Sequence, residues 1–464
     1  MSVSNTGSLA VSTVLNNGGL GTTLNGGLGT GLNVSQVVAA QIQADSAPLT
    51  QLQSQQTALS AQSSALNTIE TDVTNLQSAL FNLTNFSGGL NAQQVTSSDA
   101  TVLTGTAGTT AQTATHNIVV KSLATTASYY TNPSTLPATG STPLATGGSF
   151  TINAGSNSAT ISITSSNNTL TGIASAINNS AAGAAVTASV INDSSGSRLA
   201  IVSNSSGAAN DFTITDTGNS TGLNFTKAAS GGDASLSVDN IPVSSASNTV
   251  TGAIQGVTLN LSAANPNETV SLNVSPDTTQ AGTAISQFVS DYNTVVGDLN
   301  AQFAVSPTTG NAGVLASDGT LSLVQDQLLS AVNATGTGSV ANLGSIGINL
   351  QNDGTLAIDV PTLTNALNSN FSAIQNFFQS TTNGVGQALT AGLTNIADPT
   401  QGSIALDLNG ITAQQTDITS QIANLQANLT QEQQTLTTKY SNVNVILQQL
   451  PVLQKQLSQQ LAGA

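Results

Sequence analysis

The chain has 464 residues, of which 38% are hydrophobic and only 6% are charged, and its formal net charge is −16. Five Lys and Arg residues cannot neutralise enough phosphates for nucleic-acid binding, and they argue against an anionic membrane surface as partner. The absence of cysteine excludes disulfides, thiolate metal sites and cysteine nucleophiles. The length suits roughly two to four domains.

Residues 1–30 repeat Gly-Gly-Leu-Gly and Asn-Gly units, which predicts a disordered Gly/Asn-rich extension. This start lacks the basic residues and the continuous apolar core of a cleaved secretory signal. No apolar run reaches the ~18 residues of a membrane-spanning helix, so we expect no membrane insertion. A secreted protein that uses a dedicated, non-cleaving export route fits this composition.

Residues 31–90 predict a helical segment. Pro48, within this segment, fits the first turn of a helix, where a missing N–H costs little. Beyond Pro48, apolar residues recur every seven positions and a second apolar row follows three positions later, as in a coiled coil. We expect Gly88-Gly89 to end the helix. The predicted packing positions are Leu52, Leu59, Leu66, Ile69, Val73, Leu76, Leu80 and Leu83.

Residues 91–280 alternate short runs of Val, Ile and Thr with Asn, Ser and Gly, and this pattern predicts antiparallel strands. A short helix is predicted over Thr169–Asn178. The loop near 131–148 separates earlier strands from later ones, so we predict about two β-rich modules. The clearest strands are Asn117–Val120, Ser149–Asn153, Ala159–Ile163 and Val257–Leu261.

Residues 281–410 predict a helical domain with a small hairpin. Helical periodicity returns at Ile285, and two further pieces cover 321–332 and 363–378. Between these pieces, Leu343–Asp359 predicts a hairpin that turns at Asn352-Asp353-Gly354.

Residues 411–464 predict a C-terminal coiled-coil helix with two heptad rows, which Pro451 should kink or break near its end. The predicted packing and oligomerisation positions are Ile411, Ile418, Ile422, Leu425, Leu429 and Leu436. The positions further along, predicted to face a filament or a chaperone, are Val443, Ile446, Leu450, Leu453 and Leu457.

Both ends of the chain therefore carry apolar stripes that need a partner. The inner parts, 50–85 and 411–435, can pair within one subunit as a stalk, whereas 31–47 and 436–464 are predicted to order on assembly. Glu432 and Lys439 occupy seam positions, where they set the register or mark a seam that rotates to solvent. The fold class is multidomain α+β, with long terminal helices and an antiparallel β-rich middle.

Catalytic and metal-binding candidates are weak. The single histidine, His116, starts a strand-like run with no charged residue close in sequence, which favours a strand-edge histidine over a catalytic base. Neither a nucleophile elbow nor a calcium-loop spacing occurs, and Asn349–Gly354 is better explained as a hairpin turn. We therefore expect no enzyme activity and no cofactor.

Several segments resemble the filament cap proteins of the bacterial flagellum, a family of hook-associated proteins (hook-associated protein 2). Long helical ends, a β-rich middle and no cysteine are the plan of flagellar axial proteins in general. The opening near Gly31-Leu32 resembles the family's first helix, although the Gly/Asn-rich extension before it departs from the family pattern. The other similar segments are His116–Ala124, Val238–Val243, Gly256–Leu261, Gly313–Leu321, Leu343–Ile348, Asp353–Leu356 and Lys439–Leu447.

The resemblance implies a homo-oligomeric ring of about five subunits at the filament tip, outside the cell. The β-rich middle would form a plate and the terminal helices would form legs. The partners would be flagellin, the hook–filament junction proteins and a type III export chaperone on the C-terminal helix. The alternatives are a flagellin or junction protein, or a secreted adhesin that binds mucin or host glycan, although paired terminal heptads do not follow from adhesion alone.

Overall fold

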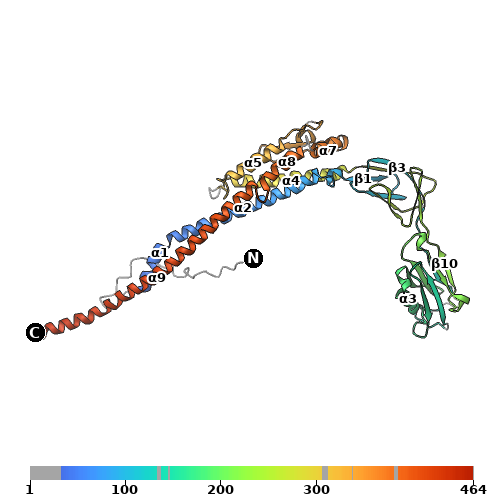
Figure 1. Ribbon diagram of the computed structural model, residues 1–464, viewed down its shortest axis with the longest axis horizontal. Helices are drawn as coiled ribbons and strands as arrows, with labels where there is room; N and C mark the ends of the chain where they lie inside the picture. Colours follow the sequence, from blue (N-terminus) through green and yellow to red (C-terminus); the bar gives the residue numbers. More distant parts are fainter. Residues whose placement is uncertain are drawn as a thin grey trace. The chain divides into compact units, whose positions relative to one another are not determined.

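The computed structural model describes residues 33–132, 137–144, 147–305, 312–336, 338–380 and 385–462 (Figure 1). The predicted extension, residues 1–30, lies outside these ranges. The chain forms two compact units. Unit 1 comprises Met1–Thr74, Thr294–Leu328 and Gly392–Ala464, and unit 2 comprises Asn75–Asn293 and Leu329–Ala391.

The helices and strands alternate in blocks, with the strands mainly in the middle of the chain. The helices are α1 (Val34–Asp45), α2 (Ala47–Thr84), α3 (Leu170–Asn178), α4 (Thr278–Phe303), α5 (Gly319–Val332), α6 (Val360–Ser369), α7 (Phe371–Gln379), α8 (Val385–Ala397) and α9 (Ser403–Ala462). The strands are β1 (Gln93–Ser97), β2 (Leu103–Ala107), β3 (Ala114–Ser122), β4 (Ser128–Thr131), β5 (Gly148–Asn153), β6 (Ala159–Ile163), β7 (Val186–Asp193), β8 (Gly196–Ser203), β9 (Thr213–Thr215), β10 (Phe225–Ala229), β11 (Ala234–Val238), β12 (Ile241–Ser245), β13 (Thr249–Ile254), β14 (Val257–Leu261), β15 (Val270–Pro276), β16 (Ile348–Leu350) and β17 (Leu356–Ile358).

Short polar side chains cap the N-termini of several helices. Each accepts a hydrogen bond from a backbone N–H group that has no partner inside the helix. The Asn33 side chain accepts the Gln36 N–H before α1, and Thr169 accepts the Gly172 N–H before α3. Asp359 caps α6, which carries Pro361 in its first turn, where a proline costs no hydrogen bond. Residue types that are poor inside helices thus set where these helices begin.

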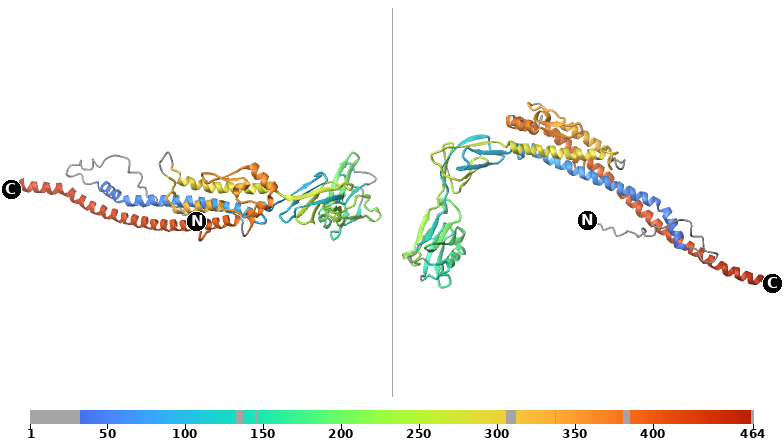
Figure 2. Two further views of the ribbon diagram at one scale, coloured as in Figure 1. Left: turned by 90° about the horizontal axis from the view of Figure 1, so that it is seen from above. Right: turned by 180° about the vertical axis from the view of Figure 1, so that it is seen from behind.

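Unit 1 contains α1 and α9, which lie side by side (Figures 1 and 2). Helix α9 is 60 residues long, or about 90 Å, and it begins at Ser403 rather than at Ile411. Of the two predicted effects of Pro451, a kink or a break, the break is wrong, because the helix continues through Pro451 to Ala462. Pro451 removes one backbone hydrogen bond, and in this exposed stretch water can reach the carbonyl that loses its donor.

One β-rich core in unit 2 lies between two antiparallel sheets. The first has the strand order β1-β15-β3-β11-β12, and the second has the order β13-β14-β2. Alternate residues of β14 and β15 point inward, as the period-two pattern predicts. The core includes Ile118, Val120, Leu236, Leu259 and Leu272.

A second β-rich core in unit 2 combines a sheet of order β10-β4-β8-β7, a sheet of order β6-β5-β9 and the helix α3. Its buried residues include Phe150, Ile173, Ile177, Leu199 and Phe212. The two separate cores agree with the predicted number of about two modules in an α+β fold. The loop near 131–148 does not divide them, because β4 before it and β7, β8 and β10 after it form one sheet.

The helical part of unit 2 agrees with the sequence in most elements. The predicted hairpin forms, with Ile348 opposite Ile358. The predicted helix over 363–378 is two helices, α6 and α7, with Asn370 between them. Helix α4 begins at Thr278 rather than at Ile285, α8 was not predicted, and α2 ends at Thr84, before Gly88-Gly89.

Asparagine side chains hold distant parts of unit 2 together. The Asn293 amide donates to the Leu356 carbonyl at 2.8 Å and accepts the Leu356 N–H at 2.7 Å. Asn178 makes the same pair of bonds to Ala188, and Asn248 makes it to Ala124. Each amide bonds to the N–H and the C=O of one residue, as a paired strand would. It thereby satisfies backbone groups that would otherwise lack a partner.

Replacing Asn293 with alanine should lower the free energy of unfolding by about 1–3 kcal/mol, because two partly buried backbone groups of Leu356 lose their partners. Urea unfolding followed by circular dichroism measures this change. Asn349→Ala is the matched control, since Asn349 is exposed on strand β16. Equal effects of the two substitutions would contradict the assigned role of Asn293.

Candidate assembly surface

The heptad rows of α2 become more deeply buried along the helix. The predicted positions from Leu66 onward are almost fully buried, whereas Leu52 and Leu59 are half-buried. The buried positions are Leu66, Ile69, Val73, Leu76, Leu80 and Leu83. Most of this row is therefore occupied by packing within the chain.

The heptad rows of α9 change in the opposite direction. Ile411 and Leu429 are buried, and Ile418, Ile422, Leu425 and Leu436 are half-buried. The positions beyond are largely exposed: Val443 (40%), Ile446 (60%), Leu450 (39%), Leu453 (57%) and Leu457 (59%). In both views of Figure 2, the end of α9 runs past α1 with no other described element beside it.

The heptad rows missed part of this exposed surface. Val445, Val452 and Leu461 are 55%, 59% and 73% exposed, and they lie outside the two heptad rows. The apolar surface of the last α9 turns is therefore broader than a two-row seam. We call Val443, Val445, Ile446, Leu450, Val452, Leu453, Leu457 and Leu461 the α9 apolar segment. An unweighted count of Val, Ile and Leu over 443–461 would have found it.

The exposure of the two charged seam positions distinguishes between a charge that sets the register and a seam that rotates to solvent. Glu432 and Lys439 are both exposed. This exposure supports a seam that rotates to solvent after Leu429, rather than a buried charge that sets the register.

The prediction that residues 31–47 lack a partner within the chain is wrong for most of that segment. Helix α1 covers Val34–Asp45 and contacts α9, and its Val38 is only 3% exposed. The sequence did not reveal this contact because the two helices are far apart along the chain, and an apolar face on α1 does not say which segment covers it.

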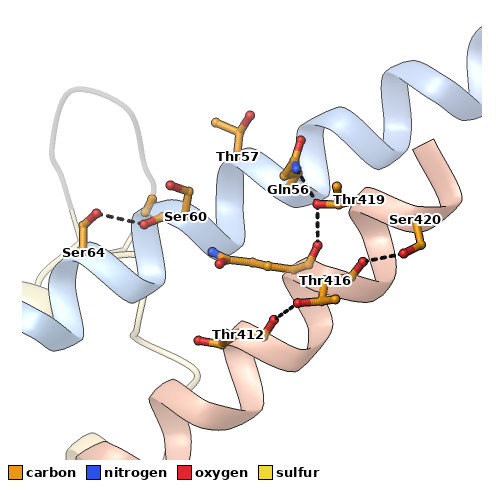
Figure 3. Close-up of a pocket in the computed structure, with 10 residues that line it drawn as sticks. Gln56, Thr57, Ser60, Ser64, Thr412, Thr416, Thr419 and Ser420 are labelled. Carbon is orange, nitrogen blue, oxygen red and sulfur yellow. Dashed lines mark hydrogen bonds between the residues drawn. The ribbon is translucent and has the colours of Figure 1, made fainter. Parts of the chain in front are cut away.

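A groove of about 890 Å³ runs between α2 and α9 in unit 1 (Figure 3). The Gln56 Nε2 atom donates to the Thr419 hydroxyl at 3.0 Å across it. The lining residues are Gln56, Thr57, Ser60, Ala61, Ser64, Thr412, Gln415, Thr416, Thr419 and Ser420. The groove is therefore neutral and lined by small or amide-bearing side chains.

The hydroxyl groups of this groove are already used within their own helices. Ser64 donates to the Ser60 carbonyl, and Thr416 donates to the Thr412 carbonyl. Thr419 and Ser420 donate to the carbonyls four residues earlier in the same way (Figure 3). Since no lining residue is titratable, the groove has no group suited to acid–base or nucleophilic chemistry.

His116 has a structural partner. Its Nδ1 atom lies 2.7 Å from Oδ2 of Asp239, at the turn between β11 and β12. The Asn117 N–H and the His116 side chain hold the pKa of Asp239 below its usual value. Asp239 has a φ of +50° and Asn240 a φ of +68°, as a tight hairpin turn requires. The pair therefore fastens a turn to strand β3.

Other chemical features give no second candidate. Within the described ranges, no three His, Cys, Asp or Glu side chains come together as metal ligands. No helix in the described part of the chain is both long and apolar enough to span a membrane. The surface with the strongest functional signal is the α9 apolar segment.

Two family models match the chain. The model described as the flagellar hook-associated protein 2 N-terminus matches residues 30–127. The model described as the flagellar hook-associated protein 2 C-terminus matches residues 231–451. The two matches cover α1, α2, most of α9 and the first β-rich core.

Individual relatives agree with these models. Flagellar hook-associated protein 2 of Escherichia coli K12 is 30% identical over 454 residues, which cover 90% of this chain and 96% of that protein. B-type flagellar hook-associated protein 2 of Pseudomonas aeruginosa is 28% identical over 314 residues, which cover 60% of this chain and 64% of that protein.

A solved structure has the same fold over most of the chain. The crystal structure of the D1-D2-D3 domains of the flagellar cap protein FliD from Escherichia coli aligns with a TM-score of 0.55 at 28% identity. The alignment covers 75% of this chain and 99% of that one. The antiparallel β-rich middle and the long helices are thus the fold of that structure.

Two leucine truncations separate packed heptad positions from exposed ones. Leu66→Ala should lower the free energy of unfolding by about 2–5 kcal/mol, because it leaves a cavity at a fully buried site. Leu453→Ala should change it by less than about 0.5 kcal/mol, since that side chain is 57% exposed. Denaturant unfolding of the monomer measures both, and a large loss at Leu453 would show that the segment is packed.

Proposed function

This chain belongs to the flagellar hook-associated protein 2 family, the flagellar cap proteins, and we propose that it promotes the insertion of exported flagellin at the filament tip. The family is structural and not enzymatic, and its place is outside the cell at the end of the flagellum. The cap would hold arriving flagellin, guide it into the next open position and prevent its loss.

The α9 apolar segment is the observation that supports this proposal. A helix stretch that exposes eight Val, Ile and Leu side chains leaves water-exposed apolar area that a partner can bury. The preceding apolar heptad positions of α9, from Ile411 to Leu436, are at least half-buried, so the change occurs within one continuous helix. Such a division suits a stalk that is anchored in its own subunit and extended toward the filament.

We propose a homo-oligomeric ring of about five subunits as the working form. The β-rich middle, residues 91–280, would form the plate, and the terminal helices would form the legs. Before export, a type III export chaperone would cover the α9 apolar segment and keep it from binding other apolar surfaces. The filament side would meet flagellin and, at the start of growth, the hook–filament junction proteins.

A deletion strain and the purified protein together distinguish a cap from a flagellin. A strain that lacks a cap should secrete monomeric flagellin and grow no filaments. If the chain were a flagellin, the purified protein alone would assemble into filaments. Electron microscopy of the purified protein, with the subunits of each ring counted, tests the proposed stoichiometry.

A triple variant of the α9 apolar segment tests its role. Ile446→Gln, Leu453→Gln and Leu457→Gln together should abolish swimming and release flagellin monomers into the medium. Gln keeps the helix propensity of the segment while it removes the apolar contacts. The thermal unfolding midpoint of the purified monomer should stay within about 2 °C of the parent, since exposed side chains contribute little to monomer stability.

A matched control has three Gln substitutions at exposed leucines outside the segment. Leu323, Leu350 and Leu406 are 47%, 40% and 56% exposed. The control strain should swim normally. Normal filaments in the strain with the α9 variant would show that the segment does not contact the filament.

A further inference from the structure

Two aspartates meet where α5 begins and α9 makes its first turns, both within unit 1. The Asp318 side chain precedes α5 and accepts the Thr320 N–H at 2.8 Å. The Asp407 side chain comes from α9 and lies within hydrogen-bonding contact of the Asp318 carboxyl group and of the Thr320 side chain. Neither aspartate belongs to the α9 apolar segment or to the groove of Figure 3.

One oxygen of this pair lacks a donor. The Asp407 Oδ2 atom is buried, and no hydrogen-bond donor among the described residues reaches it. Ser403 Oγ, one helical turn earlier on the same face of α9, is buried and unpartnered as well. This contact between helices is therefore polar and incompletely satisfied, which is costly at a buried site.

No positive charge compensates the two carboxyl groups. In the described structure, the groups that act on Asp407 are the Asp318 carboxyl and the Thr320 side chain, and no Lys, Arg or His from any neighbouring element contributes. The cations of α9 itself, Lys439 and Lys455, lie roughly 48 Å or more further along the helix. Two carboxylates in contact repel each other, whereas one shared proton converts the contact into an O–H···O hydrogen bond.

We propose that Asp407 carries a proton that it donates to the Asp318 side chain, and that this contact is a pH-sensitive joint between α5 and α9, closed in mildly acidic solution and loosened at neutral pH. The missing donor at the Asp407 carboxyl group is then this proton itself. This proposal concerns the internal stability of unit 1 and does not depend on the cap function.

The direction of the pH effect follows from proton binding. Burial, together with Asp318, raises the pKa of Asp407 from 3.8 to about 6. Between these values the folded chain binds a proton that the unfolded chain has lost. Folding stability from this pair is therefore fully present below pH about 4, falls as the pH rises to about 6, and stays lost above it.

Thermal unfolding of the full chain at pH 5 and pH 8 tests the joint. The midpoint of the parent chain should be lower at pH 8 by about 2–4 °C. Asp407→Asn supplies a permanent N–H donor to Asp318, so its midpoint should lose this pH dependence and at pH 8 exceed that of the parent. Asp318→Asn should act in the same way, and the double substitution should gain nothing more, since the two changes repair one contact.

Asp417→Asn is the matched control, because Asp417 is an exposed residue of the same helix. It should retain the full pH difference of the parent. Hydrogen exchange of peptides that cover residues 315–325 supplies a local measurement. After correction for the intrinsic rise of amide exchange with pH, protection there should be weaker at pH 8 than at pH 5 only when both aspartates are present. A pH difference that survives in Asp407→Asn, or that disappears equally in Asp417→Asn, would overturn the proposal.

Discussion

Neutral hydrogen bonds between side-chain amides and backbone groups connect parts of this structure that are far apart in sequence. Five cations in 464 residues leave little scope for ion pairs. Asn248 and Asn293 instead each pair with both backbone groups of one distant residue, and Asn178 does so with Ala188, ten residues further on. Glutamine side chains also bond to distant backbone groups. Gln379 donates to the Leu83 carbonyl, and Gln62 donates to the Val314 carbonyl. Unlike exposed ion pairs, such bonds are insensitive to salt.

Because the chain has so few cations, its ion pairs occur at only a few places. The Arg198 guanidinium bonds Asp193 and lies over the Tyr130 ring, and the Lys227 ammonium bonds Asp211 and lies over Tyr129. Arg198 thereby links strands of one sheet, β10-β4-β8-β7, and Lys227 links β10 of that sheet to the segment before β9. Where two acidic groups meet without a cation, as at Asp318 and Asp407, the only remaining neutralising agent is a proton. A charge-poor chain is therefore stable to salt yet locally sensitive to pH.

Periodicity predicted the elements whose stability is local or repetitive. Strands such as Ser149–Asn153 and the hairpin at Asn352-Asp353-Gly354 follow from alternation and turn chemistry, which neighbouring residues determine. The amide links could not be predicted, since Asn is abundant and only the folded chain brings Asn293 to Leu356. The contact of α1 with α9 was missed for the same reason. Pro451 does not end the helix, because the turns on both sides keep their own backbone hydrogen bonds and water can reach the carbonyl that lacks a donor.

The exposed end of α9 is helical although little packs against it, and this has a consequence for assembly. An isolated helix is favoured by Leu and Gln, which are frequent after Leu447, and it extends here from a nucleus already formed by the packed heptads. Propagation from an existing helix avoids the cost of nucleation. A partner that binds the α9 apolar segment therefore need not order it from a random chain, and more of the apolar burial remains as net affinity. The packed heptad positions in the first half of α9 thus contribute to binding without touching the partner.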